Sequence, residues 1–129
     1  MSYYQEEKIA MSLKENTPLL DKGGEIHVLL SPKNTGNKNL IMGLGKTPVN
    51  EKVLAHVHSY SEECFYVIQG QGTLHLAGDE SIEFEEGMAV RVPQGVEHWV
   101  ENTGDVELQV IFSSAPLAPT PSQGHQNKA

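Results

Sequence analysis

The sequence predicts an all-β fold, a double-stranded β-helix or jelly roll, because apolar and polar residues alternate from Glu25 to Phe112. Turn-forming residues interrupt this alternation about every 8–12 residues, as is typical of small sandwiches and barrels. No segment between these two residues has the longer period of a core helix. We therefore expect about nine or ten short strands in two packed sheets.

The individual strands are expected where apolar side chains recur at every second position. Clusters of Gly, Asn and Asp, such as Gly70-Gln71-Gly72 and Asn102–Asp105, mark the turns between them. The alternation predicts strands near residues 25–30, 40–45, 53–57, 64–69, 73–76, 82–84, 88–92, 97–101 and 106–112.

Two terminal segments flank the predicted domain, which we place at residues 25–114. Residues 1–24 are mainly polar and end in a turn signal, so we expect an N-terminal arm. Residues 115–129 contain Pro116, Pro119 and Pro121. Proline lacks the N–H that a central strand needs, so this segment is expected to be an extended, proline-rich tail.

The composition indicates one acidic, soluble domain. The 129 residues suffice for one core, and nine Lys and Arg against 17 Asp and Glu give a net charge of -8, opposite to that of nucleic-acid-binding proteins. No apolar run approaches the roughly 20 residues of a membrane span, and the first residues lack a secretory signal pattern. Because the single cysteine, Cys64, cannot form an internal disulfide, we expect a cytoplasmic location.

Two histidines and a glutamate in adjoining strands are candidate functional residues. His56 and His58 are one residue apart, and side chains alternate along a strand, so both rings are expected on one side. Glu63 opens the next strand on the face that Phe65 shares, whereas Glu62 is expected to face outward. Two imidazoles and one carboxylate would therefore line one wall.

A third imidazole is expected from His98, which follows the turn Pro93-Gln94-Gly95 and opens a further strand. Three imidazoles and a carboxylate are suitable ligands for a first-row divalent metal, and they leave coordination positions for water or substrate. The ligand set accepts zinc, nickel, iron or manganese alike. We predict one such ion per chain, held by His56, His58, Glu63 and His98.

These residues resemble the two motifs of the cupin superfamily. The first, Gly-x5-His-x-His-x3,4-Glu-x6-Gly, is met from His56 to Gly70, although ten residues rather than five separate Gly45 from His56. The second, Gly-x5-Pro-x-Gly-x2-His-x3-Asn, is met from Gly87 to Asn102. The resemblance implies a cupin barrel over residues 25–114, with the same four residues as metal ligands.

A narrower resemblance connects the chain with the small cupin cyclases of aromatic polyketide biosynthesis, the tetracenomycin type. It rests on the stretches Gly23–Pro32, His56–Glu63 and Pro116–His125. The resemblance implies aldol condensation and dehydration of a poly-β-ketone chain, with the metal as a Lewis acid. Glu63 or a metal-bound hydroxide would take the α-proton, so the four predicted ligands are also the predicted catalytic residues.

Two other functions stay open from the residues alone. The same ligands around iron(II) would suit a cupin oxygenase that acts on an aromatic or enolic small molecule. A non-catalytic cupin that binds a metal or a small ligand is the alternative from a different class. In each case the expected partner is a small molecule rather than nucleic acid or membrane.

The face that Glu63 shares is expected to form an apolar wall, suited to a hydrophobic substrate or to a plain core. Gln69 is a possible polar contact on this wall, whereas parity places His27 and His75 on the opposite face. His125 lies in the tail and is expected to be solvated. The predicted wall consists of Met42, Leu44, Phe65, Val67, Met88, Val90, Val110 and Phe112.

The opposite faces of several strands also carry apolar side chains. Cys64 is expected there as a thiol packed in the core or at an interface, because it alternates with Glu63. Apolar side chains on the outer faces of strands usually mark interfaces, so we predict a homodimer. The residues that motivate this prediction are Tyr66, Ile68, Trp99 and Ile111.

Overall fold

The computed structural model describes residues 8–57, 60–117 and 126–127. Nine strands lie between Glu25 and Ala115, and a tenth lies near the C-terminus. They are β1 (Glu25–Leu30), β2 (Ile41–Thr47), β3 (Lys52–Val57), β4 (Glu62–Gln69), β5 (Gln71–Leu76), β6 (Glu80–Glu85), β7 (Ala89–Val92), β8 (His98–Asn102), β9 (Leu108–Ala115) and β10 (Gln126–Asn127).

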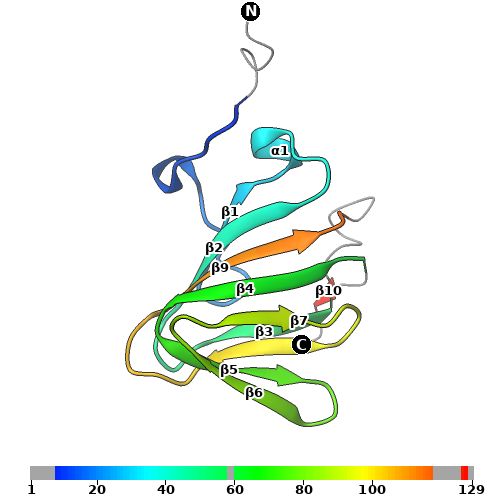
Figure 1. Cartoon of the computed structure of the whole chain (residues 1–129). Helices are drawn as coiled ribbons and strands as arrows, with labels where there is room; N and C mark the ends of the chain where they lie inside the picture. Colours follow the sequence, from blue (N-terminus) through cyan, green and yellow to red (C-terminus); the bar gives the residue numbers. More distant parts are fainter. Residues whose placement is uncertain (1–7, 58–59, 118–125, 128–129) are drawn as a thin grey trace, which may run out of the picture.

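The strands form two five-stranded sheets in which neighbouring strands are antiparallel (Figure 1). We call the sheet with the order β1-β2-β9-β4-β7 sheet A and the sheet with the order β10-β3-β8-β5-β6 sheet B. Consecutive strands often lie in different sheets, as in a jelly roll. The predicted all-β jelly roll is confirmed.

Helical structure in residues 8–57, 60–117 and 126–127 is limited to a 3-10 turn, η1 (Leu13–Glu15), and a short helix, α1 (Pro32–Thr35). The Ser31 hydroxyl begins α1 by accepting a hydrogen bond from the Asn34 N–H at 3.1 Å. Gly36 ends it in the left-handed conformation. In this part of the chain we find no helix that is long and apolar enough to span a bilayer.

Both terminal segments contact sheet edges. In the N-terminal segment, Leu19 pairs with Ile26 of β1, and the Asn16 side-chain amide lies 3.2 Å from Nδ1 of the buried His27. In the C-terminal segment, β10 pairs with β3 at the edge of sheet B. The tail therefore contributes a two-residue edge strand beyond the proline-rich stretch, which the sequence pattern did not predict.

The core lies between the inner faces of the two sheets. Phe65 of sheet A and Phe84 of sheet B meet edge to face, with ring centroids 5.2 Å apart, and so connect the two layers. The buried core consists of Phe65, Val67, Leu74, Phe84, Val90, Val92 and Leu108, with Leu76, Val100, Val110 and Phe112 packed against it.

The strand predicted near residues 40–45 is present as β2, but its predicted orientation was wrong, because its inner face is formed largely by glycines. Gly43 pairs with Phe112 of β9 and is buried, and a Cβ added to Gly43 would lie 2.6 Å from the Phe112 ring. The apolar neighbours Met42 and Leu44 therefore point to the other face, and Met42 is exposed. Alternation of hydrophobic residues misleads here because the space that a side chain would fill belongs to Phe112.

Asn102, the last residue of β8, ties the two sheets together at one end of the barrel. It is 2% exposed, and its amide donates hydrogen bonds of 2.9 Å to the carbonyls of Thr47 in β2 and Val106. Its carbonyl oxygen accepts a third bond of 2.9 Å from the Gly104 N–H. A buried side chain thus forms hydrogen bonds with three backbone groups, one in sheet A and two in the loop that follows β8.

We expect the substitution Asn102→Ala to lower the free energy of unfolding by about 2–4 kcal/mol, because one buried and two partly buried hydrogen bonds to backbone groups are lost. Urea unfolding followed by circular dichroism measures this. The neighbouring exposed Thr103 supplies the matched control, since Thr103→Ala is expected to stay within about 0.5 kcal/mol of wild type. Equal stability of the two variants would contradict the structural role of Asn102.

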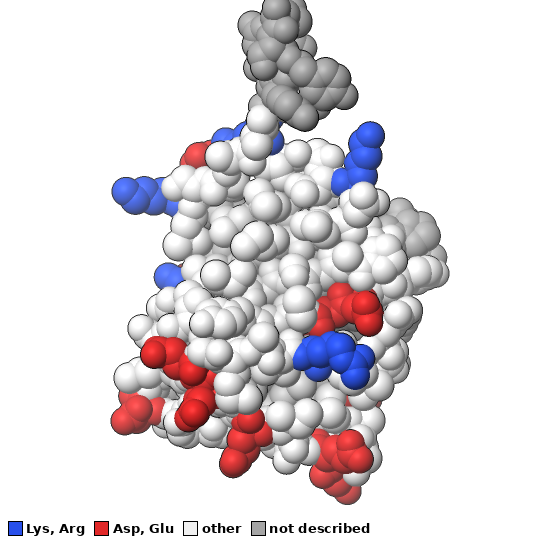
Figure 2. Space-filling view, in the orientation of Figure 1, with Lys and Arg blue, Asp and Glu red and all other residues white. Residues whose placement is uncertain are grey.

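Sheet A has a second, largely uncharged face turned away from the core. Tyr66 is 48% exposed on it, and Met42 and Ile68 are 36% and 37% exposed. In Figure 2 the surface over β2 and β9 is largely uncharged, an acidic and a basic side chain lie next to each other right of centre, and further acidic side chains gather in the lower part of the view. This outer face of sheet A is lined by Met42, Leu44, Cys64, Tyr66, Ile68, Ala89, Ile111 and Ser113, with the charged Glu62 and Arg91 beside Cys64.

Trp99 and Cys64 both lie on outer faces. Trp99 faces outward as predicted, but it belongs to sheet B, where its ring stacks on His75 with a centroid distance of 3.7 Å, so it lies on a different surface from Tyr66. Cys64 is exposed on the outer face of sheet A, with Sγ 3.3 Å from the Ser113 hydroxyl oxygen, so of its two predicted places the core is wrong. Alternation within one strand does not reveal which sheet the strand joins.

The homodimer stays a prediction, with the outer face of sheet A as its contact surface. A second copy also carries a net charge of -8, so a face without acidic residues at its centre is where two copies can approach without repulsion. Tyr66→Glu is then expected to give a folded monomer in sedimentation equilibrium. Ile82 in β6 is 45% exposed and provides the control, since Ile82→Glu is expected to stay dimeric. A monomeric wild-type chain at high micromolar concentration would refute the prediction.

Candidate functional site

Glu63 and His98 meet in the interior from opposite sheets. Glu63 is the second residue of β4 in sheet A, and His98 is the first residue of β8 in sheet B. Glu63 Oε2 lies 3.5 Å from His98 Nε2, and the two side chains are 16% and 1% exposed. Glu62 is exposed on the other face of β4, so the predicted orientation of the two glutamates is confirmed.

The turn before β8 delivers His98 in a fixed orientation. Gly95 has a φ of 76°, a conformation that glycine adopts without strain, and β8 begins three residues later. His98 Nδ1 lies 2.9 Å from the Val96 carbonyl oxygen. Because a carbonyl oxygen only accepts hydrogen bonds, Nδ1 carries the proton, and in the neutral imidazole the lone pair is on Nε2.

This donor set fits a divalent metal ion. The lone pair of His98 Nε2 and the carboxylate oxygen of Glu63 face each other at 3.5 Å, which is longer than an ordinary hydrogen bond. Two atoms that share a metal at bond lengths near 2.1 Å are separated by about 3.0–3.4 Å. A histidine that donates its other N–H to a backbone carbonyl is the usual arrangement of a metal-ligating imidazole. The chemistry of these two residues therefore suits an ion between them.

The remaining predicted ligands are placed only in part. The backbone of His56 belongs to β3, where it pairs directly with His98 across the β3–β8 ladder. His58 lies outside the described residues. Among the side chains that the structure describes there is no group of three potential metal ligands. The structure thus brings Glu63, His98 and the backbone of His56 together.

Partly buried hydrophobic residues adjoin the Glu63–His98 pair. Leu76 of β5 pairs with His98, and Phe112 of β9 pairs with Phe65, two residues along β4 from Glu63. Both side chains pack against the core yet keep some exposure. The two polar groups therefore lie at the border of an apolar interior, where an aromatic ring can find contacts.

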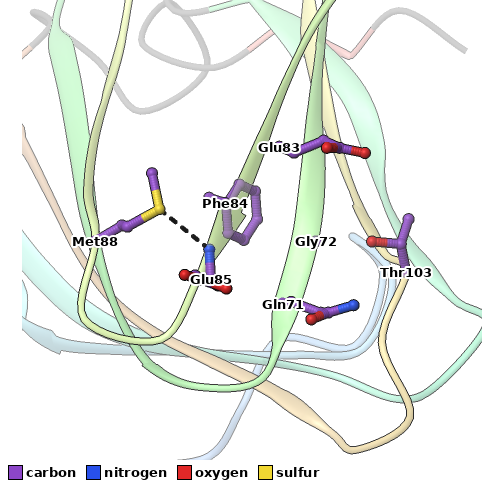
Figure 3. A pocket seen from close by; sticks show the side chains of 7 residues that line it. All are labelled: Gln71, Gly72, Glu83, Phe84, Glu85, Met88 and Thr103. Atoms are coloured by element: carbon purple, nitrogen blue, oxygen red, sulfur yellow. Dashed lines mark hydrogen bonds between the residues drawn. The ribbon is translucent and has the colours of Figure 1, made fainter.

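Three residues of the predicted apolar wall do not belong to it. Met42 and Leu44 face outward, and Met88 is 39% exposed. Met88 instead lines a cavity of about 330 Å³ at the end of the barrel away from His98 (Figure 3). Figure 3 shows Phe84 and Met88 facing this cavity together with polar residues, and the lining residues are Gln71, Gly72, Glu83, Phe84, Glu85, Met88 and Thr103.

Other polar residues singled out from the sequence are used elsewhere. The Gln69 amide donates to the Glu107 carbonyl at 2.9 Å, so it closes a loop rather than lining the site. His75 pairs with Trp99 and lies 2.9 Å from a Glu101 carboxylate oxygen, on the outer side of sheet B as predicted. His125 lies outside the described residues. The sequence did not single out Ser114, which is buried and pairs with Glu63.

The comparison with protein families agrees with this architecture. The family described as "Cupin domain" matches residues 43–114, which include every strand from β3 to β8 and most of β2 and β9. The chain belongs to the cupin family. The match covers more than half of the chain and contains Glu63 and His98.

Relatives of this cupin include proteins of polyketide biosynthesis. "Polyketide synthase CurC" from Streptomyces cyaneus is 35% identical over 115 residues, which are 89% of this chain and 74% of the relative. "Tetracenomycin polyketide synthase protein TcmJ" from Streptomyces glaucescens is 35% identical over 118 residues, which are 92% and 77% of the two chains. The resemblance to the tetracenomycin type is thereby confirmed.

A solved structure has the same fold. The polyketide cyclase RemF from Streptomyces resistomycificus superposes with a TM-score of 0.73, covering 95% of this cupin and 86% of RemF. The two sequences are 15% identical, so this likeness shows the fold alone.

We expect His98→Ala and Glu63→Ala each to lose most of the metal that the wild type retains, because each removes one of the two facing donor atoms. Protein loaded with zinc and dialysed would be analysed by mass spectrometry of the metal, with about one ion per wild-type chain expected. Glu62→Ala is the matched control, since Glu62 is exposed on the other face of the same strand. Equal metal loss in Glu62→Ala and Glu63→Ala would disprove the assignment.

Proposed function

We propose that this cupin is a metal-dependent cyclase that closes a ring in an aromatic polyketide precursor by aldol condensation. The observation that carries the proposal is the facing pair of Glu63 Oε2 and His98 Nε2, largely buried beside apolar residues. The similarity to CurC and TcmJ, which extends over most of the chain, supports the polyketide substrate class.

The proposed ligands are His56, His58, Glu63 and His98. A divalent ion bound by them would supply Lewis acidity to a carbonyl oxygen of the substrate. The chain's own part is to keep this site in place. The Val96 carbonyl fixes the His98 ring, and the pairing of β4 with β7 and β9 fixes the backbone of Glu63.

Glu63 is the proposed base. Its Oε2 faces His98, and a carboxylate has a second oxygen that can accept a proton. This oxygen would take a proton from a methylene group between two carbonyls, and the resulting enolate carbon would form a bond to a second carbonyl carbon of the same molecule. The new alkoxide would regain the proton from Glu63, and loss of water would then give the conjugated ring.

The apolar residues beside the pair would orient the substrate. Leu76 and Phe112 keep partial exposure next to His98 and Phe65, so a planar, hydrophobic intermediate can pack against them. Holding two carbons of one chain in contact lowers the entropic part of the barrier.

The stoichiometry of oxygen tests the proposal. An aldol cyclase loses water and consumes no dioxygen, so zinc-loaded protein is expected to give the same product mass under nitrogen and under air. The substrate is a poly-β-ketone intermediate, and a reaction without protein measures spontaneous cyclisation. A product that forms only in air and is heavier by one or two oxygen atoms would replace the cyclase by an oxygenase.

Variants connect the activity with the site. Glu63→Gln keeps a side-chain oxygen but removes the base, so the rate of ring closure is expected to fall by about 10²–10⁴-fold. Glu62→Gln is expected to keep the wild-type rate, because its side chain lies on the outer face. If neither Glu63→Gln nor metal removal changes the rate, Glu63 and the metal take no part in ring closure.

A further inference from the structure

Ser114 is a buried hydroxyl beside the candidate metal site. It is the seventh residue of β9 and is 5% exposed. It pairs with Glu63 on one side and with Ile41 of β2 on the other. Paired residues of antiparallel strands project to the same face, so the hydroxyl and the Glu63 side chain lie on the inner face of sheet A with Cβ atoms about 4.5–5.5 Å apart.

The hydroxyl oxygen of Ser114 is closed to solvent and has no hydrogen-bond partner within the part of the chain that the structure describes. Burying a hydroxyl in this way is unfavourable by about 1–3 kcal/mol. Ser61, which is also buried, shows the contrast, since its hydroxyl donates a hydrogen bond to the Pro116 carbonyl. The unpaired Ser114 hydroxyl thus lowers the stability of the metal-free protein. A role of this hydroxyl in the metal site would explain why a serine stands at this position.

The neighbours of Ser114 limit what its partner can be. Ile41 offers only an apolar side chain, whereas Glu63 offers two carboxylate oxygens with about four acceptor positions, and one oxygen faces His98. Solvent water does not reach the hydroxyl oxygen. The carboxylate of Glu63 is therefore the acceptor that a small rotation of either side chain brings within reach.

We propose that Ser114 is a positioning residue that donates a hydrogen bond to the Glu63 carboxylate when the metal is bound. The inference rests on the metal site proposed above. Binding of the ion to Glu63 and His98 holds the carboxylate in one orientation, and the hydroxyl then stabilises that orientation. Residues that hydrogen-bond to a metal ligand without touching the metal typically raise the metal affinity by about 10–100-fold. We expect the same range for Ser114.

Two measurements test the proposed role of Ser114: the zinc affinity and the melting temperature of the metal-free protein. The variant is Ser114→Ala, and zinc affinity is measured by competition with a chromogenic chelator. We expect zinc binding to weaken by about 10–100-fold. The metal-free variant is expected to melt at the wild-type temperature or above it, because an unpaired buried hydroxyl has been removed. Ser113→Ala on the outer face is the control and is expected to keep wild-type zinc affinity.

Each other result has a definite meaning. Wild-type zinc affinity in Ser114→Ala would overturn the role of Ser114 while leaving the metal site intact. A metal-free Ser114→Ala that melts well below wild type would also overturn it, because the hydroxyl would then have a structural partner. A folded wild-type chain that binds no zinc, nickel, iron or manganese would overturn the metal site and this inference together.

Discussion

The register of β4 between β7 and β9 is the constraint on which the candidate site depends. It places Glu63 opposite Val92 and Ser114, and the same register buries Phe65 and Val67 in the core. A slip by one residue would turn Glu63 outward and expose both hydrophobic side chains, at a cost of about 1.5–3 kcal/mol each. The carboxylate is thus oriented by hydrophobic burial two and four positions further along the strand.

The position of His98 depends on the packing of the two sheets, because its partner Glu63 belongs to the other sheet. The contact of Phe65 with Phe84 connects the two layers, and the hydrogen bonds of Asn102 fix the far end of β8. Close-packed protein interiors have low compressibility, so the packing between the sheets also restricts the distance between Glu63 and His98. The site is therefore organised before any ligand arrives.

Much of this arrangement follows from alternation along the sequence, which correctly placed Glu63, Phe65 and Val67 inward and His75 outward. Alternation works there because one face of each strand is consistently apolar. It failed in β2, where glycines such as Gly43 face the core to admit the ring of Phe112.

Other features could not be read from the sequence at all. Ser114 has no apolar signature, and only the pairing of β9 with β4 shows that it lies beside Glu63. The edge strand β10 has two residues, too few for any periodicity. Trp99 and Tyr66 both alternate outward from their strands, but only the assignment of β8 and β4 to different sheets shows that they lie on separate surfaces. Long-range pairing, not local pattern, decides each of these.

Three polar groups of the inner face, Glu63, His98 and Ser114, lie at the same end of the barrel, which has an energetic consequence. Glu63 and His98 lie at the start of their strands and Ser114 near the end of its own, next to a core of apolar residues. With Nδ1 bound to the Val96 carbonyl, the lone pair of His98 Nε2 faces a carboxylate oxygen across 3.5 Å. When the imidazole is neutral, these two electron-rich atoms repel each other in a medium of low dielectric constant, and the packing of the core opposes their separation. A cation bound between them would convert this repulsion into attraction, so we infer that the packing of the apolar core helps to keep the two donors in place for an ion.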